Sequence, residues 1–170
     1  MPNFGAVISK HNIKVLNEAT TLSRGKCNCR DKNKCPLDNE CLSENVLYEA
    51  VISSDLPNYV PKVYRGITAP KFKLRYANHM QSFTCEKYSN STELSKEVWR
   101  LKSKGASNNI KWKIVKQCPT YNPNSKRCTL CLSEKLSILE YCGSNMLNKR
   151  SEIVATCRHR TKFLLKHYCT

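Results

Sequence analysis

The stretch "NVLYEAVISSDLPNYVPKVYRGIT", residues 45–68, decides the fold class. It holds two runs rich in β-branched and aromatic residues, 45–53 and 59–68, on either side of the turn-forming segment "SDLPN". This pattern predicts a β-hairpin. Alternation in the second run puts Tyr64 and Gly66 on one face and Arg65 on the other, where an apolar residue is expected. Pro61 restricts the start of that run to an edge or irregular position, because proline cannot donate to the ladder.

A helix is expected directly after the hairpin, because Pro70 suits the first turn of a helix. Arg75 and His79 are four residues apart, so they share one side of this helix. The neighbouring stripe is apolar and is expected to be buried; it consists of Phe72, Tyr76, Met80 and Phe83.

The remainder of the chain predicts further helices and one strand. A second helix is expected from about residue 92 to 103, with Asn90 and Glu93 resembling a capping box and Gly105 ending it. "NIKWKIVK" (109–116) alternates as a half-exposed strand does. A helix near 129–141 is expected to bury Leu132, Leu136 and Leu139. Glu134 lies off that face, in one row with Leu130, Ile138 and Tyr141, and a carboxylate in an apolar row needs a reason.

This order of elements predicts an α+β domain: a small three-stranded antiparallel sheet flanked by helices. We expect three parts: a helical arm or linker over 1–25, a cysteine-rich, zinc-knuckle-like segment over 26–44, and the main domain over 45–168. A basic helix is expected over 152–168. The abrupt start also suggests a piece of a longer polyprotein.

The charge of the chain favours a polyanionic partner. The 29 lysines and arginines stand against 13 acidic residues, a formal net charge of +16 over 170 residues. Each phosphate that a basic side chain neutralises releases counterions, so nucleic acid is the first expectation. The sequence has no run of about 18 apolar residues and no signal-peptide core, which favours an intracellular protein without a membrane span.

Eleven cysteines suggest bound metal rather than secretion, because the number is odd. The spacing C-x-C-x5-C-x5-C, in a segment too polar to fold on apolar burial, predicts a structural Zn²⁺ site; free thiols or disulfides are the alternatives. A second group of cysteine and histidine ligands near residue 130 suggests another Zn²⁺ site; the alternative is that Cys131 and Cys157 are small core residues. The first set is Cys27, Cys29, Cys35 and Cys41, and the second is Cys128, Cys131, Cys157 and His159.

Several short motifs occur in an ordered series. They are "VLY" (46–48), "VYRG" (63–66), Arg75 with His79, Glu134, and "LNK" (147–149). This series resembles the GIY-YIG nucleases. The segments "CNCRDKNKCPLDNEC" (27–41), "ELSKEVWRLK" (93–102), "IKWKIV" (110–115), "KRCTLCLSEK" (126–135) and "LNKRSEIVATCRHR" (147–160) more narrowly resemble the endonuclease region of Penelope-like retroelements.

The resemblance implies a nuclear, Mg²⁺- or Mn²⁺-dependent DNA endonuclease that nicks target DNA, fused behind a reverse transcriptase and acting with it or its RNA template. Tyr48 would be the general base or position water, supported by Tyr64. Arg75 would stabilise the transition state, and His79 would transfer a proton or bind phosphate. Glu134 would ligate one Mg²⁺, and Asn148 would support the site.

Two residues depart from the family pattern. Val46 stands in place of a glycine, and Arg65 stands where the family has an aliphatic residue. An arginine on that face must reach solvent or pair with an acid. The departures favour the alternative function, a catalytically inactive, zinc-stabilised nucleic-acid-binding domain. A secreted, disulfide-bonded basic protein is a third alternative.

Overall fold

The structure is a computed structural model that describes residues 26–122, 127–149, 153–154, 156–157 and 159. The expected arm over 1–25 and most of the expected helix over 152–168 lie outside the described residues. Two single-turn 3-10 helices, η1 (Lys32–Lys34) and η2 (Glu86–Tyr88), accompany the main elements. In chain order these are β1 (Val46–Ser54), β2 (Lys62–Thr68), α2 (Phe72–Thr84), α3 (Glu93–Ser103), β3 (Asn108–Gln117) and α4 (Thr129–Leu139).

The strands form one antiparallel sheet in the order β2-β1-β3. The predicted hairpin is confirmed, with Tyr48 opposite Gly66 and Glu49 opposite Arg65. β2 lies at the edge, as Pro61 requires, and β1 lies in the centre. The predicted α+β class with a small three-stranded antiparallel sheet is therefore confirmed.

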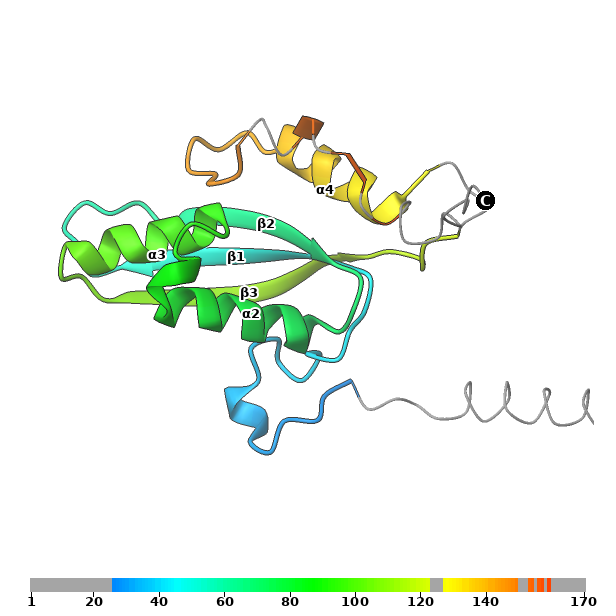
Figure 1. Ribbon diagram of the computed structural model, residues 1–170, viewed down its shortest axis with the longest axis horizontal. Helices are drawn as coiled ribbons and strands as arrows, with labels where there is room; N and C mark the ends of the chain where they lie inside the picture. The colour runs from blue at the N-terminus through cyan, green and yellow to red at the C-terminus, as the bar shows by residue number, and fades with distance from the viewer. Residues whose placement is uncertain (1–25, 123–126, 150–152, 155, 158, 160–170) are drawn as a thin grey trace, which may run out of the picture.

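Helices pack on both sides of the sheet (Figure 1). α2 and α3 bury one face of β1 in the main core, whose buried residues include Tyr48, Ile52, Phe72 and Leu101. α4 runs along β2, and Leu130 packs near Ile67 in a smaller core. None of the helices in the described ranges combines the length and the hydropathy that crossing a membrane requires.

Two details of the helical prediction are wrong. Met80 is 41% exposed, so the buried stripe of α2 is narrower than predicted. The capping box of α3 is made by Thr92 and Ser95: the Thr92 hydroxyl accepts from the Ser95 N–H at 3.1 Å, and the Thr92 N–H donates to the Ser95 hydroxyl at 2.9 Å. The boundary shifts because this hydroxyl pair satisfies both N–H groups two residues further along.

The predicted buried face of α4 is also wrong. The side of the helix that carries three leucines is exposed, and the opposite side, which includes two serines, is buried. Small serine side chains let the helix backbone approach the sheet, so packing distance rather than the number of leucines sets the orientation. The exposed residues are Leu132, Leu136 and Leu139, and the buried ones are Leu130, Ser133, Ser137 and Ile138.

The cysteine-rich segment packs against the start of α2. The Phe72 N–H donates to the Ser43 carbonyl at 2.9 Å, and the Lys73 N–H donates to the Cys41 carbonyl at 2.8 Å. These carbonyls satisfy first-turn N–H groups of a helix that has no side-chain cap. Leu37 is buried in the main core. The segment therefore holds the helix that carries Arg75 and His79.

Candidate functional site

Three predicted site residues form a hydrogen-bonded chain on the buried face of the sheet. The Arg75 Nε donates to the Tyr48 hydroxyl at 3.0 Å, and the Tyr48 hydroxyl lies 2.8 Å from His79 Nε2. Tyr48 comes from the central strand, and both partners come from α2. Their spacing of four residues puts Arg75 and His79 on one side of the helix, within reach of the same hydroxyl.

The charges of these groups fix the direction of the chain. Burial, assisted by the Arg75 charge, lowers the pKa of His79 to about 3, so the imidazole is neutral near pH 7. Burial also raises the pKa of Tyr48, although Arg75 opposes this. Arginine can only donate, so the Tyr48 oxygen accepts from Arg75. In the tautomer that carries its hydrogen on Nδ1, neutral His79 accepts the Tyr48 hydrogen at Nε2.

Tyr64 and Gly66 complete the tyrosine side of the site. The ring centroids of Tyr48 and Tyr64 are 6.5 Å apart. Burial disfavours the charge of Arg75, but the two tyrosines together raise its pKa, so the guanidinium stays charged. Gly66 lies directly under the Tyr48 ring: a Cβ there would be 2.6 Å from the Tyr48 hydroxyl oxygen. Only glycine leaves room for this ring.

Glu134 is half-buried on α4, in the same row as Leu130 and Ile138. Its negative charge is one cause of the raised pKa of Tyr48, so the carboxylate acts on the tyrosine site. Arg75 and His79 also line a pocket of ≈ 320 Å³, and no acidic side chain lines it. Its lining residues are Arg75, Asn78, His79, Gln81, Ser82, Tyr88, Ser91 and Thr92.

Arg65 connects the sheet to α4. Its Nε donates to Glu49 at 3.0 Å, and its Nη1 donates to the Ser137 carbonyl at 2.5 Å. Glu49 also pairs with Lys113 at 2.7 Å. The guanidinium lies 5.1 Å from the ring centroid of Tyr141, within cation–π range. Arg65 therefore pairs with an acidic residue, as expected for an arginine on this face, and its contact with Ser137 holds the helix that carries Glu134.

Asn148 acts on the same edge strand through the backbone. Its side-chain oxygen accepts from the Arg65 N–H at 2.7 Å, and its side-chain nitrogen donates to the Arg65 carbonyl at 2.8 Å. This bidentate contact replaces a neighbouring strand at the edge of β2. Asn148 therefore supports the position of Arg65 in the edge strand.

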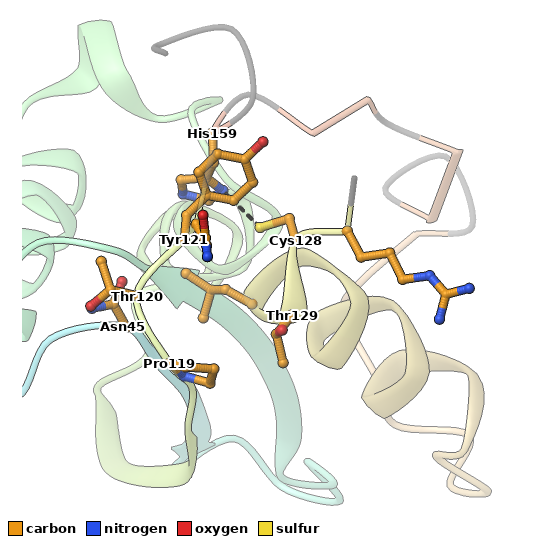
Figure 2. A pocket seen from close by; sticks show the side chains of 10 residues that line it. Asn45, Pro119, Thr120, Tyr121, Cys128, Thr129 and His159 are labelled. Carbon is orange, nitrogen blue, oxygen red and sulfur yellow. Dashed lines mark hydrogen bonds between the residues drawn. The ribbon is translucent and has the colours of Figure 1, made fainter. Parts of the chain in front are cut away.

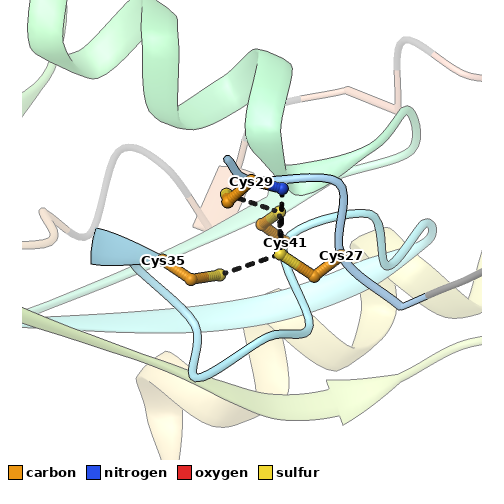
Figure 3. A group of neighbouring side chains, drawn as sticks. All are labelled: Cys27, Cys29, Cys35 and Cys41. Atoms are coloured by element: carbon orange, nitrogen blue, oxygen red, sulfur yellow. Dashed lines mark hydrogen bonds between the residues drawn. The ribbon is translucent and has the colours of Figure 1, made fainter. Parts of the chain in front are cut away.

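The first predicted metal cluster is assembled (Figure 3). Its four sulfur atoms lie within 4.8 Å of one another, and the closest pairs are 3.5–3.6 Å apart. Four ligands at about 2.3 Å from a tetrahedral Zn²⁺ would be about 3.8 Å apart. The group could therefore hold a metal ion and fits zinc. It consists of Cys27, Cys29, Cys35 and Cys41.

The second cluster comes from the start of α4 and the end of the described chain. Its four ligand atoms also lie within 4.8 Å of one another; Cys131 Sγ is 3.5 Å from Cys157 Sγ and 3.2 Å from His159 Nδ1. Figure 2 shows Cys128 directed toward His159, at 3.5 Å. This group could hold a metal ion too. The ten cysteines in the described ranges are all free thiols.

Sequence reasoning missed Glu49 and Ser137. Glu49 is 5% exposed and pairs with both Arg65 and Lys113. Burial alone would raise the pKa of Glu49, but these two cations outweigh burial and lower it. The signal for Glu49 was available, because an acid and a basic residue on opposite strands of a hairpin can pair. No local signal marks the Ser137 carbonyl.

The chain was compared with protein-family models, with curated proteins and with solved structures, and none of them matches it.

Proposed function

We propose that the chain is a divalent-metal-dependent DNA endonuclease of the GIY-YIG type. The observation that carries this proposal is the chain Arg75–Tyr48–His79, on which the charge of Glu134 also acts. A fixed cation can stabilise the charge that develops on the phosphate, and a phenol and a neutral imidazole can transfer the proton of the attacking water. The net charge of +16 favours the polyanionic substrate.

The arrangement supports a two-proton relay during attack by water. The Tyr48 oxygen accepts the proton of the water while its own hydrogen passes to His79 Nε2, which is a neutral acceptor. Arg75 stays charged and offers its remaining N–H groups to the phosphate, where negative charge develops. The bond between phosphorus and the 3′-oxygen breaks as the new bond from water forms, and the leaving 3′-oxygen takes a proton from solvent water to become a hydroxyl.

The metal assignments follow from the ligand types. Glu134 would hold one Mg²⁺ or Mn²⁺, which supplies Lewis-acid stabilisation of the phosphate when bound. The two cysteine clusters each present four protein ligands, so a zinc ion there has no open position for water and is structural. Hydrolysis and metal-stabilised folding thus use different ions.

The proposal predicts that the chain nicks supercoiled plasmid in Mg²⁺. Arg75→Ala and Glu134→Ala should each remove nicking while the zinc content per chain stays at the parent value, because neither residue belongs to a cysteine cluster. Lys111→Ala, a change of an exposed lysine on β3, is the matched control for lost charge. Parent-like nicking by both site variants would refute the assignment.

One observation favours a second candidate, a nucleic-acid-binding domain without catalysis. Tyr48 is fully buried, and burial raises its pKa, which opposes its use as a base. Salt-dependent DNA affinity without cleavage in Mg²⁺, Mn²⁺ or Ca²⁺ would decide for this candidate. The nuclease proposal requires binding of DNA to admit water at the Tyr48 hydroxyl.

A further inference from the structure

A second pocket lies at the opposite end of α4 from the Arg65 contact. It has a volume of ≈ 280 Å³ and lies where the sheet ends and α4 begins (Figure 2). Asn45 precedes β1, Pro119 and Thr120 follow β3, and Thr129 begins α4. The full lining is Asn45, Pro119, Thr120, Tyr121, Asn122, Arg127, Cys128, Thr129, Leu130 and His159.

The wall of this pocket on the sheet side is held by hydrogen bonds. The Asn45 N–H donates to the Ala69 carbonyl at 3.0 Å, and the Asn45 carbonyl accepts from the Cys118 N–H at 2.8 Å. The Asn45 side-chain nitrogen donates to the Thr120 hydroxyl at 3.3 Å. These contacts fix an amide and a hydroxyl at the rim, where each keeps further hydrogen-bonding capacity.

The opposite wall depends on the second metal cluster. Cys128 and His159 both line the pocket and both belong to that cluster, with Sγ and Nδ1 3.5 Å apart. Tyr121 is half-buried beside them and packs on the smaller core around Cys128 and Leu130. A metal ion bound there would therefore fix the wall next to an aromatic ring.

The chemistry of the lining selects the ligand. An aromatic ring, two amides, two hydroxyls and an exposed arginine line the pocket, and none of its lining residues is acidic. The volume of ≈ 280 Å³ lies just below the range for small-molecule sites, which begins at about 300 Å³, so the pocket suits a small ligand. A planar base with hydrogen-bonding edges, followed by a phosphate, fits both the size and the groups.

We propose that this pocket binds one unpaired nucleotide of a DNA strand, with the base stacked on Tyr121 and its phosphate near Arg127. The proposal rests on the proposed function for its nucleic-acid substrate. It adds a second contact point on that substrate, separate from Arg75 and His79. A protein that grips an unpaired nucleotide prefers strands that are frayed or displaced over a closed duplex.

The test is fluorescence anisotropy of the zinc-loaded full chain with a labelled single-stranded oligonucleotide and with a blunt duplex of the same sequence. Tyr121→Ala should weaken single-strand binding by about 5- to 150-fold, the range for one stacked base, and leave duplex binding unchanged. Tyr121→Phe keeps the ring and should bind as the parent does. A plot of log affinity against log salt concentration has a negative slope, and Arg127→Met should make that slope about 0.7 less steep for the single strand.

Two results would overturn the proposal: parent-like single-strand binding by Tyr121→Ala, or an equal loss on both ligands, which would indicate damage to the fold. Zinc content measured on each variant keeps these results interpretable. The pocket and the nuclease can fail separately. If the parent nicks plasmid and Tyr121→Ala does not change single-strand binding, only the pocket proposal is overturned. If single-strand affinity depends on Tyr121 but the parent does not nick plasmid, only the nuclease proposal is overturned.

Discussion

Gly66→Ala tests the packing on which the tyrosine site depends. The added Cβ would lie 2.6 Å from the Tyr48 hydroxyl oxygen, 2.8 Å from its Cζ and 3.1 Å from Tyr64 Cε1. Tyr48 is fully buried and cannot move into solvent. An extra methyl group in such a core typically costs about 1–3 kcal/mol, and we expect a loss of this size in the free energy of unfolding. Urea unfolding followed by tyrosine and tryptophan fluorescence measures it.

Gly105→Ala is the matched control for this experiment. No atom lies within 4 Å of its Cβ position, but its φ is +68°, so alanine costs about 1–2 kcal/mol by backbone strain alone. The two variants should therefore lose similar stability, and only Gly66→Ala should also displace the Tyr48 hydroxyl and reduce nicking. If Gly66→Ala unfolds at the same urea concentration as the parent, the account of this site is wrong.

Three further predictions concern pH, the α4 contact and the first cluster. The lowered pKa of His79, about 3, means that the unfolded chain binds the proton first, so stability present above pH 6.5 is lost as pH falls toward 3. Between pH 6.5 and 5 the parent should lose about 1.5 kcal/mol more than His79→Gln in urea unfolding; equal losses would contradict this. Arg65→Met leaves the buried Glu49 with one cation, and should cost about 2 kcal/mol by the same measurement, with parent-like stability as the opposing result. Cys41→Ser should lower the zinc content, measured by elemental analysis, by one ion per chain, and Cys142→Ser, a change of an exposed cysteine outside both clusters, should leave it unchanged. Unchanged zinc in the Cys41 variant would exclude that site.

The hairpin and the tyrosine pair were predictable because strand alternation has a period of two. Once Tyr48 and Tyr64 are assigned to neighbouring strands, their faces follow from the register, and the turn at 54–58 sets that register. The cysteine spacing likewise predicted the first cluster, because a segment without an apolar core needs another source of stability. The second cluster was one of two interpretations, the other being that Cys131 and Cys157 are small core residues.

The orientation of α4 was not predictable from its own sequence. Three leucines favoured one face, but the helix is oriented by contacts with distant residues: Arg65 reaches the Ser137 carbonyl, 72 positions away. The partner of Arg65 was within reach of the sequence, because the hairpin register places Glu49 opposite it. Read alone, Arg65 suggested a defect in the site, whereas in the fold it anchors the helix that carries Glu134.

The account depends most on Glu134 acting as a metal-binding residue of a nuclease. The direct measurement is the initial rate of plasmid nicking against Mg²⁺ concentration, for the parent and for Glu134→Gln, which keeps the size of the side chain and removes its charge. The account predicts Mg²⁺-dependent nicking by the parent and none above background by Glu134→Gln at equal zinc content. The same Mg²⁺ dependence and rate in both proteins would contradict it.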